Sequence, residues 1–360
     1  MINIKNQDRD LIGGEKLKVL VAMSGGVDSA VSAFLLRKQG YEVVGVHFKM
    51  EDDLFFSRYS LNHKVCCSPD DTSDAIKIAK KIDIPIKIID LKAEFRERII
   101  KDFIKDYQMG ITPNPCAWCN KKMKFWALEK IGKEFGIELF ATGHYAFVKG
   151  GKIYMGSDTK KDQSYFLSLL TKDILKKLIL PVGEMKKEEV RKIAIENELL
   201  VGTKPDSQDI CFIPDGNLKK FFENEGIPIR SGPVKDIHGN IIGTHEGYQI
   251  YARGQRKGVG IAAGKRVYVI GVDPATNTVI VGDKSDLVKE SIKIDDLNLL
   301  YDVSKPFDCM CKLRSTGPLI RCRLDPVEKS VLFYESAIPV AGQVIAFYKE
   351  KELIGGAIQM

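Results

Sequence analysis

The chain has 360 residues, of which 44% are hydrophobic and 29% are charged, a composition that can bury a core and excludes a wholly disordered or fibrous protein. At about 150 residues per domain, this length predicts two or three domains. The 55 lysines and arginines exceed the 48 acidic residues by seven, a mild surplus that suits a polyanionic partner without requiring one.

The N-terminal half alternates predicted strands and helices. After a polar lead-in over residues 1–16, an apolar run predicts a strand at Leu17–Met23, and apolar residues at helical spacing predict a helix at Asp28–Gln39. Further strands are expected at 42–48, 84–89 and 138–141, and further helices at 69–82, 92–107 and 120–135. Such alternation indicates βαβ units, and hence an α/β fold with a Rossmann-like parallel sheet.

The pattern changes after about residue 150. Helices are expected at 172–180 and 186–199, and from about residue 226 short strand candidates alternate with turns rich in Gly, Pro, Asn and Asp. We therefore predict a catalytic domain at 1–212, a small β-rich central domain at 213–283 and a C-terminal β-barrel at 284–360.

The strongest local signal is the run Ser24-Gly25-Gly26-Val27-Asp28-Ser29, between the first predicted strand and the first helix. Paired glycines allow a tight turn in which backbone N–H groups and the helix N-terminus converge on an anion. Asp28 either caps the helix or reaches a bound Mg²⁺. The lysine of a Walker A loop is missing, which excludes that nucleotide site. The plainer alternative is a glycine turn with an Asp cap, but the flanking strand and helix favour phosphate binding.

Eight cysteines are too few for a disulfide scaffold. No run is long and apolar enough to span a membrane, and the polar N-terminus does not look like a signal peptide, so we expect a cytoplasmic protein with no membrane contact. In that reducing compartment an unpaired cysteine usually has a catalytic role, binds a metal or is simply buried in the core. Cys309, Cys311 and Cys322 lie in predicted strands, where alternation puts Cys309 and Cys311 on one face and indicates core residues, and the roles of Cys66 and Cys67 stay open.

Two cysteine segments suggest chemistry. Cys116 and Cys119 lie in a proline-rich run that leads into a basic helix, where a thiol near the helix N-terminus followed by lysines gains thiolate character. Cys211 lies in the run Asp206-Ser207-Gln208-Asp209-Ile210-Cys211-Phe212. By itself a C-x-x-C pair is ambiguous between a redox pair, metal ligands and coincidence, and no second pair is present to complete a zinc ribbon.

The glycine-rich run resembles the pyrophosphate-binding loop (PP-loop) of the ATP pyrophosphatase superfamily. With the other motifs, the chain resembles the tRNA-specific 2-thiouridylase family over nearly its whole length after residue 17. The matching stretches are Ser24–Ser29, Thr112–Lys121, Ala141–Tyr145, Lys161–Leu167, Asp206–Ile213, Gly254–Gly258 and Gly342–Gln343. The resemblance implies that ATP adenylates the carbonyl oxygen of the wobble uridine of tRNA, that sulfur replaces the oxygen at position 2, and that AMP and pyrophosphate leave.

The resemblance also implies roles for single residues. Cys211 would carry sulfur as a persulfide, and Cys119 would be its catalytic partner. The implied ATP contacts are Ala22, Met23, Ser24, Gly25, Gly26, Val27, Asp28, Ser29, Met50 and Gly143, with Mg²⁺ as the companion ion. The implied tRNA contacts are Asn114, Pro115 and Cys116 near the target base, and His144, Lys161, Asp162, Gln163, Arg314, Ser315 and Gln343. The partners would be the anticodon arm of tRNA and a sulfur donor, either a cysteine desulfurase or a relay protein.

Cys116 departs from the family pattern, because many members have aspartate there. The thiol could substitute for an acid/base or a ligand. Alternatively, Cys116, Cys119 and Cys211 could hold a [4Fe–4S] cluster with one open iron that binds sulfide. The persulfide route and the cluster route both stay open.

Three basic stretches, residues 121–133, 253–266 and 312–323, would suit an RNA backbone if they act together, although each alone is more commonly a solvated face. Trp118, Tyr145 or Phe212 could stack on a base. Two other adenylating enzymes are alternatives: an ammonia-using synthetase, which would not depend on thiols, and a tRNA cytidine thiolase. An RNA-binding module or chaperone would leave the glycine-rich loop without a use.

Overall fold

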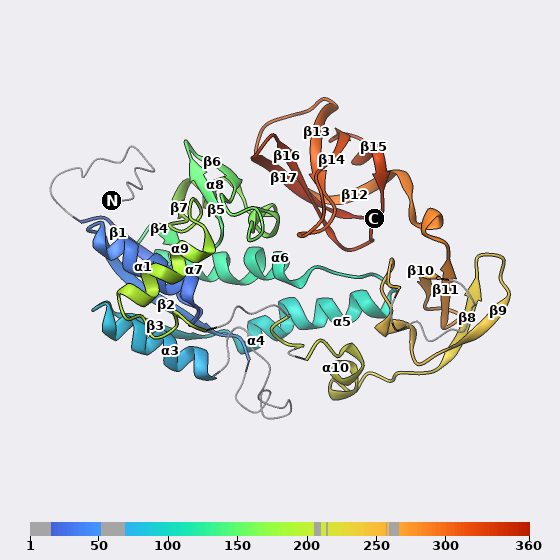
Figure 1. The fold of residues 1–360 in the computed structure, drawn as a ribbon, viewed down its shortest axis with the longest axis horizontal. Coiled ribbons are helices and arrows are strands. Elements are labelled where there is room, and N and C mark those ends of the chain that lie inside the picture. The colour runs from blue at the N-terminus through green and yellow to red at the C-terminus, as the bar shows by residue number, and fades with distance from the viewer. Residues whose placement is uncertain (1–15, 52–68, 205–209, 214, 257, 259–265) are drawn as a thin grey trace. The chain divides into compact units, whose positions relative to one another are not determined.

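The computed structural model describes residues 16–51, 69–204, 210–213, 215–256, 258 and 266–360 (Figure 1). The chain divides into two compact units. The first comprises Met1–Ile99, Cys116–Asp215 and Lys349–Ile354, and the second comprises Ile100–Pro115, Gly216–Tyr348 and Gly355–Met360. Most of the lead-in, Cys66, Cys67, Asp206–Asp209, Lys257 and Lys265 lie outside the described residues.

The first unit is built on a parallel five-stranded sheet with the order β3-β2-β1-β4-β7. Its strands are β1 (Lys18–Ala22), β2 (Glu42–Lys49), β3 (Ile86–Asp90), β4 (Leu139–Ala141) and β7 (Leu178–Ile179). The central strand β1 is apolar on both faces because helices cover both sides of such a sheet, and Val19, Leu20 and Val21 are fully buried. The predicted Rossmann-like α/β fold is confirmed.

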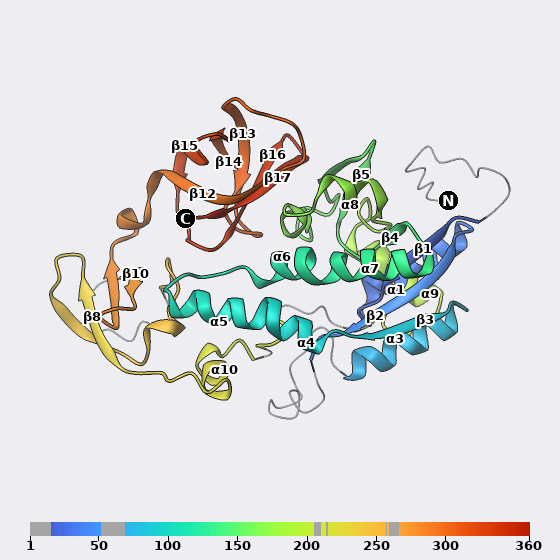
Figure 2. The ribbon, with the colours of Figure 1, turned by 180° about the vertical axis from the view of Figure 1, so that it is seen from behind.

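Helices connect these strands in the order that the sequence predicts. They are α1 (Val27–Lys38), α3 (Pro69–Lys81), α4 (Lys92–Phe95), α5 (Lys101–Gln108), α6 (Pro115–Cys119), α7 (Trp126–Phe135), α8 (Lys172–Lys177) and α9 (Lys187–Glu196). Side chains of α1, α3 and α9 share one buried cluster with the sheet. A π-helical turn at Arg96–Ile100 joins α4 to α5, and another at Asn120–Phe125 joins α6 to α7, so each pair forms one continuous helical stretch (Figure 2).

Three local predictions need correction. The helix expected at 120–135 begins at Pro115, since proline is well suited to the first helical position, where no N–H partner is required. The helix expected at 172–180 ends at Lys177, because Leu178 and Ile179 instead extend the sheet beside β4. The hairpin of β5 (Ala146–Lys149) and β6 (Lys152–Met155) was not predicted.

The second unit holds a four-stranded sheet and a barrel. The sheet has the order β10-β11-β8-β9 and comprises β8 (Gly232–Asp236), β9 (Ile241–His245), β10 (Tyr268–Asp273) and β11 (Thr278–Gly282). It is preceded by α10 (Leu218–Asn224), a helix that was not predicted in this β-rich segment. The Asn217 side chain caps that helix by accepting a hydrogen bond from the Lys220 N–H at 3.0 Å.

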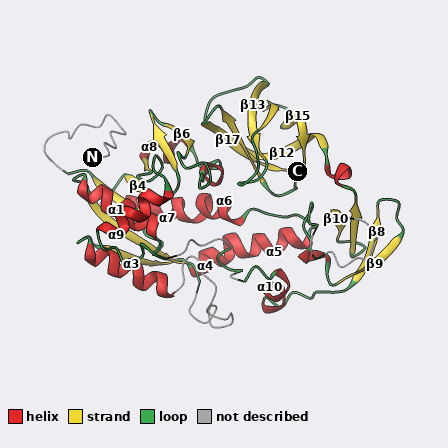
Figure 3. Cartoon of the chain, in the orientation of Figure 1, coloured by secondary structure: helices red, strands yellow, loops and turns green. Residues whose placement is uncertain are grey.

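Six strands close the C-terminal barrel in the order β12-β15-β14-β13-β16-β17, with β12 pairing back onto β17. They are β12 (Lys289–Leu299), β13 (Phe307–Lys312), β14 (Ile320–Asp325), β15 (Ser330–Ala337), β16 (Val344–Lys349) and β17 (Glu352–Gln359). From residue 289 onward the chain is drawn wholly as strands and loops (Figure 3). Closure removes the exposed strand edges of an open sheet. The predicted β-barrel is confirmed.

The barrel strands contain three buried cysteines, of which Cys309 and Cys311 were predicted to be core residues. Cys309, Cys311 and Cys322 are buried, and the sulfur atoms of Cys309 and Cys322 lie 3.6 Å apart on paired strands. The hydrogen bond to Cys322 and burial both raise the pKa of the Cys309 thiol. The Cys309 thiol is therefore protonated, and the buried cysteines serve packing.

Candidate active site

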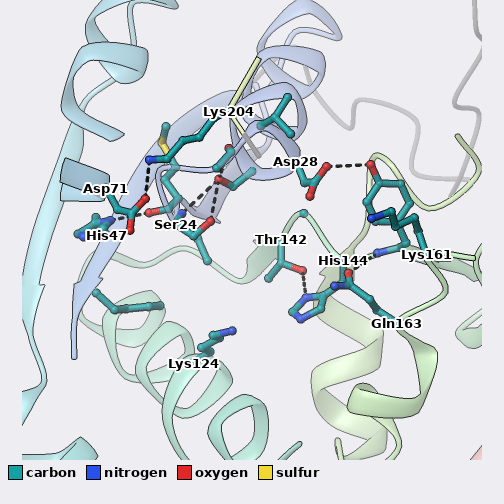
Figure 4. A pocket seen from close by; sticks show the side chains of 18 of the residues that line it. Ser24, Asp28, His47, Asp71, Lys124, Thr142, His144, Lys161, Gln163 and Lys204 are labelled. Carbon is teal, nitrogen blue, oxygen red and sulfur yellow. Dashed lines mark hydrogen bonds and ion pairs between the residues drawn. The ribbon is translucent and has the colours of Figure 1, made fainter. Parts of the chain in front are cut away.

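The two most distinctive motifs of the first unit meet at one edge of its parallel sheet. β1 is flanked by β2 on one side and by β4 on the other, so the strand order reverses between β1 and β4. Ligands of open α/β sheets bind outside the carboxyl ends of the strands at such a switch point. The loop Ser24–Ser29 follows β1 and the run Thr142–Tyr145 follows β4, and both line a cavity of about 280 Å³ (Figure 4).

The glycine-rich loop has the geometry of an anion cradle. Gly25 has φ +78, and a Cβ on it would lie 2.3 Å from the Asp71 carbonyl oxygen, so only glycine fits there. The Ser24 N–H donates to the Ser29 hydroxyl at 3.2 Å, and that hydroxyl donates to the Gly26 carbonyl at 3.0 Å. α1 begins at Val27 without a side-chain cap, so a bound anion can satisfy its first-turn N–H groups.

Asp28 does not cap α1, and that alternative of the prediction is wrong. Its carboxylate is held by two residues from distant parts of the chain: Lys187 Nζ lies 2.7 Å from both carboxylate oxygens, and the Tyr145 hydroxyl donates to Oδ1 at 2.8 Å. Only 8% of Lys187 is exposed. Sequence reasoning missed Lys187, because nothing around α9 signals a partner in the loop after β1.

A second lysine–carboxylate group lies at the other side of the loop. Lys204 Nζ is 2.7 Å from Asp71 Oδ1 and 2.7 Å from Asp74 Oδ2, and both aspartates belong to α3. Burial alone would lower the pKa of Lys204, but the hydrogen bonds to the two carboxylates raise it, so the ammonium stays charged. Together, Lys204 and Lys187 balance the acidic side chains around the loop.

The cavity residues supply too few ligands to hold Mg²⁺ alone, so the ion would bind there together with the phosphates of a substrate. Among the residues described here, no three His, Cys, Asp or Glu side chains gather closely enough to hold a metal ion. Both carboxylates that line the cavity are paired with a lysine, but only 6% of the Asp71 side chain is exposed, whereas 30% of the Asp28 side chain is. Since Mg²⁺ commonly binds through one or two carboxylates plus substrate phosphates, Asp28 is the residue that would hold it.

The run after β4 packs directly on the start of α1. A Cβ on Gly143 would lie 2.7 Å from the Ser29 nitrogen, which explains why glycine is needed. Thr142 Oγ1 and His144 Nδ1 are 2.8 Å apart. Burial, with a smaller contribution from Lys124, lowers the pKa of His144 to about 3, so the imidazole is neutral near pH 7.

The predicted run Lys161-Asp162-Gln163 is partly structural. Gln163 Oε1 accepts from the Tyr145 N–H at 3.0 Å, and the buried Asp162 carboxylate accepts from the N–H groups of Gly156 and Ser164. Lys161 and Gln163 line the cavity, together with the predicted ATP contacts Ala22, Met23, Ser24, Gly26, Val27, Asp28, Ser29, Met50 and Gly143. Contacts of these residues with ATP or tRNA stay predictions.

The three cysteines with predicted chemistry all lie in the first unit. Cys116 is exposed and Cys119 is buried, three residues apart on α6 and hence on the same side of the helix. Cys211 is half-buried. The described residues contain no metal-holding group of three ligands, so these thiols do not form a ready cluster site in this conformation.

Two aromatic stacking predictions are wrong. Tyr145 and Phe212 are 2% and 1% exposed, and Phe212 packs edge-on against Phe95 with ring centroids 5.8 Å apart. Neither ring has a face available to a base. Trp118, which is half-buried, is the remaining candidate.

Two predicted tRNA residues of the second unit contact each other. Asn114 Nδ2 donates to Gln343 Oε1 at 3.4 Å, while Gln343 Nε2 donates to the carbonyls of Thr112 and Pro113, both at 3.0 Å. Gln343 therefore fastens the segment that leads into α6, and Pro115 is the buried first residue of that helix. Arg314 is exposed and Ser315 half-buried in the loop after β13.

One basic residue of the stretches predicted to bind RNA has a structural role instead. The Arg253 guanidinium donates to the carbonyl oxygens of Pro339, Ile270 and Leu287. Burial lowers the pKa of Arg253, and its donors connect backbone segments within the second unit. Arg253 is therefore structural.

The fold and the loop define a nucleotide-binding α/β protein of the Rossmann-like class. Family models match residues 17–215 (tRNA methyl transferase HUP domain), 219–283 (tRNA methyl transferase PRC-barrel domain) and 289–358 (aminomethyltransferase beta-barrel domain). The tRNA-specific 2-thiouridylase MnmA of Pseudothermotoga lettingae is 41% identical over 346 residues, which cover 95% of this chain and 99% of that protein. Its counterpart in Thermotoga maritima is 42% identical over 354 residues, covering 95% and 98%. The chain belongs to the tRNA-specific 2-thiouridylase family.

Among solved structures, a 4-thiouridine synthetase in complex with RNA and ATP is similar over 55% of this chain and 45% of its own, with 18% identity and a TM-score of 0.34. No helix in the described part of the chain is long and apolar enough to cross a membrane.

Proposed function

We propose that this protein replaces the 2-oxygen of the wobble uridine of tRNA by sulfur, at the expense of ATP. The observation that carries the proposal is the uncapped loop Ser24–Ser29 at the switch point of the sheet, in the same unit as Cys119 and Cys211. The names of the relatives support the substrate and the reaction.

The family models are named for methyl transfer, whereas the relatives are named for thiolation. The chemistry of the site favours thiolation. A glycine-rich loop at a helix N-terminus suits the phosphates of ATP, and transfer of a methyl group does not require cleavage of ATP. The thiols at positions 119 and 211 have a direct use in sulfur transfer.

In the first step the loop would hold the β- and γ-phosphates while the uridine O2 attacks the α-phosphorus and pyrophosphate leaves. The first-turn N–H groups of α1 would stabilise the departing charge, and Mg²⁺ held by Asp28 and the phosphates would supply further charge neutralisation. Adenylation turns the carbonyl oxygen into part of a good leaving group. The proposed ATP contacts are the ones that the family resemblance implies, and they include Met50 and Gly143, which line the cavity.

In the second step the terminal sulfur of a Cys211 persulfide would attack C2 of the adenylated base, and AMP would leave with the former carbonyl oxygen. The Cys119 thiolate would then attack the Cys211 Sγ. This breaks the bond between Cys211 and the transferred sulfur, leaves that sulfur on C2, and joins the two cysteines as a disulfide. A cellular dithiol must then reduce the disulfide, and a sulfur donor protein must reload Cys211.

Two different roles are possible for Cys116 in this reaction. Cys116 is exposed at the start of α6 beside Asn114 and Pro115, which supports a role as an acid/base toward the target base. Its alternative role, as the third ligand of an iron–sulfur cluster with Cys119 and Cys211, would require these thiols to converge on a common metal site. Protein purified without oxygen and assayed for iron and acid-labile sulfide separates the two roles, because the persulfide route needs neither.

We further propose the domain division 1–212, 213–283 and 284–360, with the anticodon arm of tRNA as substrate. His144, Lys161, Gln163, Arg314 and Ser315 would contact the tRNA. Reaction would take place on the cytoplasmic tRNA pool.

The test is to incubate the protein with unmodified tRNA, Mg·ATP, a dithiol reductant and a persulfide donor (a cysteine desulfurase with L-cysteine), and to analyse the digested nucleosides by mass spectrometry. We expect 2-thiouridine and one AMP per sulfur incorporated. In Cys211→Ser, tRNA-dependent AMP formation should persist while thiolation is lost. Cys309→Ala is the matched control, because that buried thiol lies in the barrel. Normal thiolation by Cys211→Ser would refute the carrier role, and a wild-type protein that cleaves no ATP in the presence of tRNA would refute the proposal as a whole.

A further inference from the structure

Both tryptophans of the chain lie on one continuous helical stretch, Pro115–Phe135. Trp118 belongs to α6 and Trp126 opens α7, and both rings are half-buried. The same stretch contains five lysines against two glutamates. A positively charged helical surface with half-exposed aromatic rings is thus present next to Cys116 and Cys119.

Each tryptophan ring is faced by two cations. Lys122 Nζ lies 4.5 Å and Lys121 Nζ 5.3 Å from the centre of the Trp118 ring. The Arg98 guanidinium lies 3.9 Å from the centre of the Trp126 ring, and Lys130 Nζ lies 5.5 Å from it. We call these six residues the tryptophan–cation face.

The rings restrict the cations without neutralising them. A cation over an aromatic ring is held by the ring quadrupole, and its aliphatic stem covers apolar surface. Arg98 is fixed further, because Nη1 donates to the Lys122 carbonyl at 3.3 Å within the π-helical turn. Side chains that are already ordered lose less entropy when they bind a partner. The face is therefore a set of pre-positioned positive charges.

We propose that the tryptophan–cation face binds the phosphate backbone of the tRNA substrate. The inference rests on the proposed function. If Cys119 on α6 acts on an RNA base, the strand that carries this base must pass the start of the stretch, and the next charges along the same helix are Lys121 and Lys122. Ordered lysines and arginines along a helix suit phosphates, which position an RNA without reading its sequence.

The experiment measures tRNA affinity at several salt concentrations for the wild type and for Lys121→Gln/Lys122→Gln. The chain has only two tryptophans and both belong to the face, so intrinsic fluorescence reports binding there directly. We expect about tenfold weaker binding at low salt and a salt dependence whose log–log slope falls by about 1.4 to 1.8, since each of the two lost phosphate contacts removes about 0.7 to 0.9.

Lys38→Gln is the matched control. Lys38 also lies over an aromatic ring, that of Phe34, at 5.9 Å, but on α1 and outside the face. It should change neither affinity nor slope. Arg98→Gln/Lys130→Gln removes the cations over Trp126 and repeats the test at the second ring, so that a folding failure of one variant leaves the other informative.

Unchanged affinity and slope in both double variants, with normal fluorescence of the folded proteins, would overturn the proposal. The proposal would also be overturned if the double variants bound tRNA normally but lost thiolation activity only in assays with a protein sulfur donor. In that case the face would bind the donor protein. Failure of the proposed function is a different result: tRNA would bind with the expected slope, yet no ATP would be cleaved.

Discussion

Lys187 Nζ lies 2.7 Å from both carboxylate oxygens of Asp28, with 10% of the lysine side chain and 30% of the aspartate side chain exposed. The pair joins the N-terminus of α9 to the first turn of α1, and those helices share one buried cluster. The Lys187 backbone N–H also donates to Asp158 at 3.1 Å. One lysine thus fixes the orientation of the carboxylate that we propose to face Mg·ATP.

Lys187→Met should therefore destabilise the protein and impair ATP binding, because it leaves a largely enclosed carboxylate without its cation. We expect the free energy of unfolding to fall by about 1–3 kcal/mol. This is less than the cost of breaking a fully buried pair, because Asp28 is partly exposed. Urea unfolding and Mg·ATP titration measure the two effects. Asp28→Asn in the same background should recover part of the stability.

Lys192→Met is the control for this change. Lys192 lies on the same helix and pairs with Glu196 at 3.7 Å on the surface, where ion pairs contribute little. It should alter stability by no more than about 0.5 kcal/mol. Equal effects of the two substitutions would mean that the Lys187–Asp28 ion pair contributes no more to stability than a surface pair.

Gly25→Ala should disrupt the loop more than a glycine substitution at a comparable backbone angle elsewhere. At Gly25 the added Cβ meets the Asp71 backbone at 2.3 Å, whereas Gly40, with φ +93, has no heavy atom within 4 Å of the built Cβ. Gly40→Ala therefore carries only the backbone strain of about 1–2 kcal/mol, and Gly25→Ala carries the steric clash as well. Thermal unfolding and ATP affinity should both separate the two variants, and equal shifts would contradict the tight packing of the loop on α3.

The sequence predicted well what depends on local pattern. The alternation of β1 to β4 with helices follows from periodicity, and the loop Ser24–Ser29 follows from glycine chemistry. The β5–β6 hairpin could also have been found, since Gly150 and Gly151, both with positive φ, join two short apolar runs.

Contacts between distant segments could not be predicted in this way. Asp28 and Lys187 are 159 residues apart, and Asn114 and Gln343 are 229 residues apart. No periodicity links such pairs, because their contact depends on the tertiary fold and not on local sequence.

The neutral state of His144 has a consequence for acid stability. Burial, with a smaller contribution from Lys124, lowers its pKa from the ordinary 6.5 to about 3, so between these values the unfolded chain binds a proton that the folded chain does not. Stability from this residue is complete above pH 6.5 and falls as the pH is lowered towards 3, by at most about 1.4 kcal/mol per pH unit.

His144→Gln should remove that part of the pH dependence, as measured by urea unfolding between pH 4 and 7 at about half-unit steps. Burial also lowers the pKa values of His47 and His245, so the informative quantity is the difference from the wild type. The exposed His238 supplies the control substitution, His238→Gln. A wild-type slope that persists in His144→Gln would show that His144 titrates normally in the folded protein.

Gln343 offers the sharpest separation of a structural from an RNA-binding role. Its amide donates to the carbonyls of Thr112 and Pro113 and accepts from Asn114, so it holds the segment just before α6. Gln343→Glu keeps the size of the side chain but turns a carboxylate towards two carbonyl oxygens, which should cost about 1–3 kcal/mol. Gln343→Ala should cost less, because it removes the donors without adding a charge. If Gln343 acts mainly by positioning the segment, both variants should lower the thiolation rate at saturating tRNA in the order of their instability, with tRNA affinity nearly unchanged. A loss of tRNA affinity in Gln343→Ala without any loss of stability would instead establish a direct RNA contact.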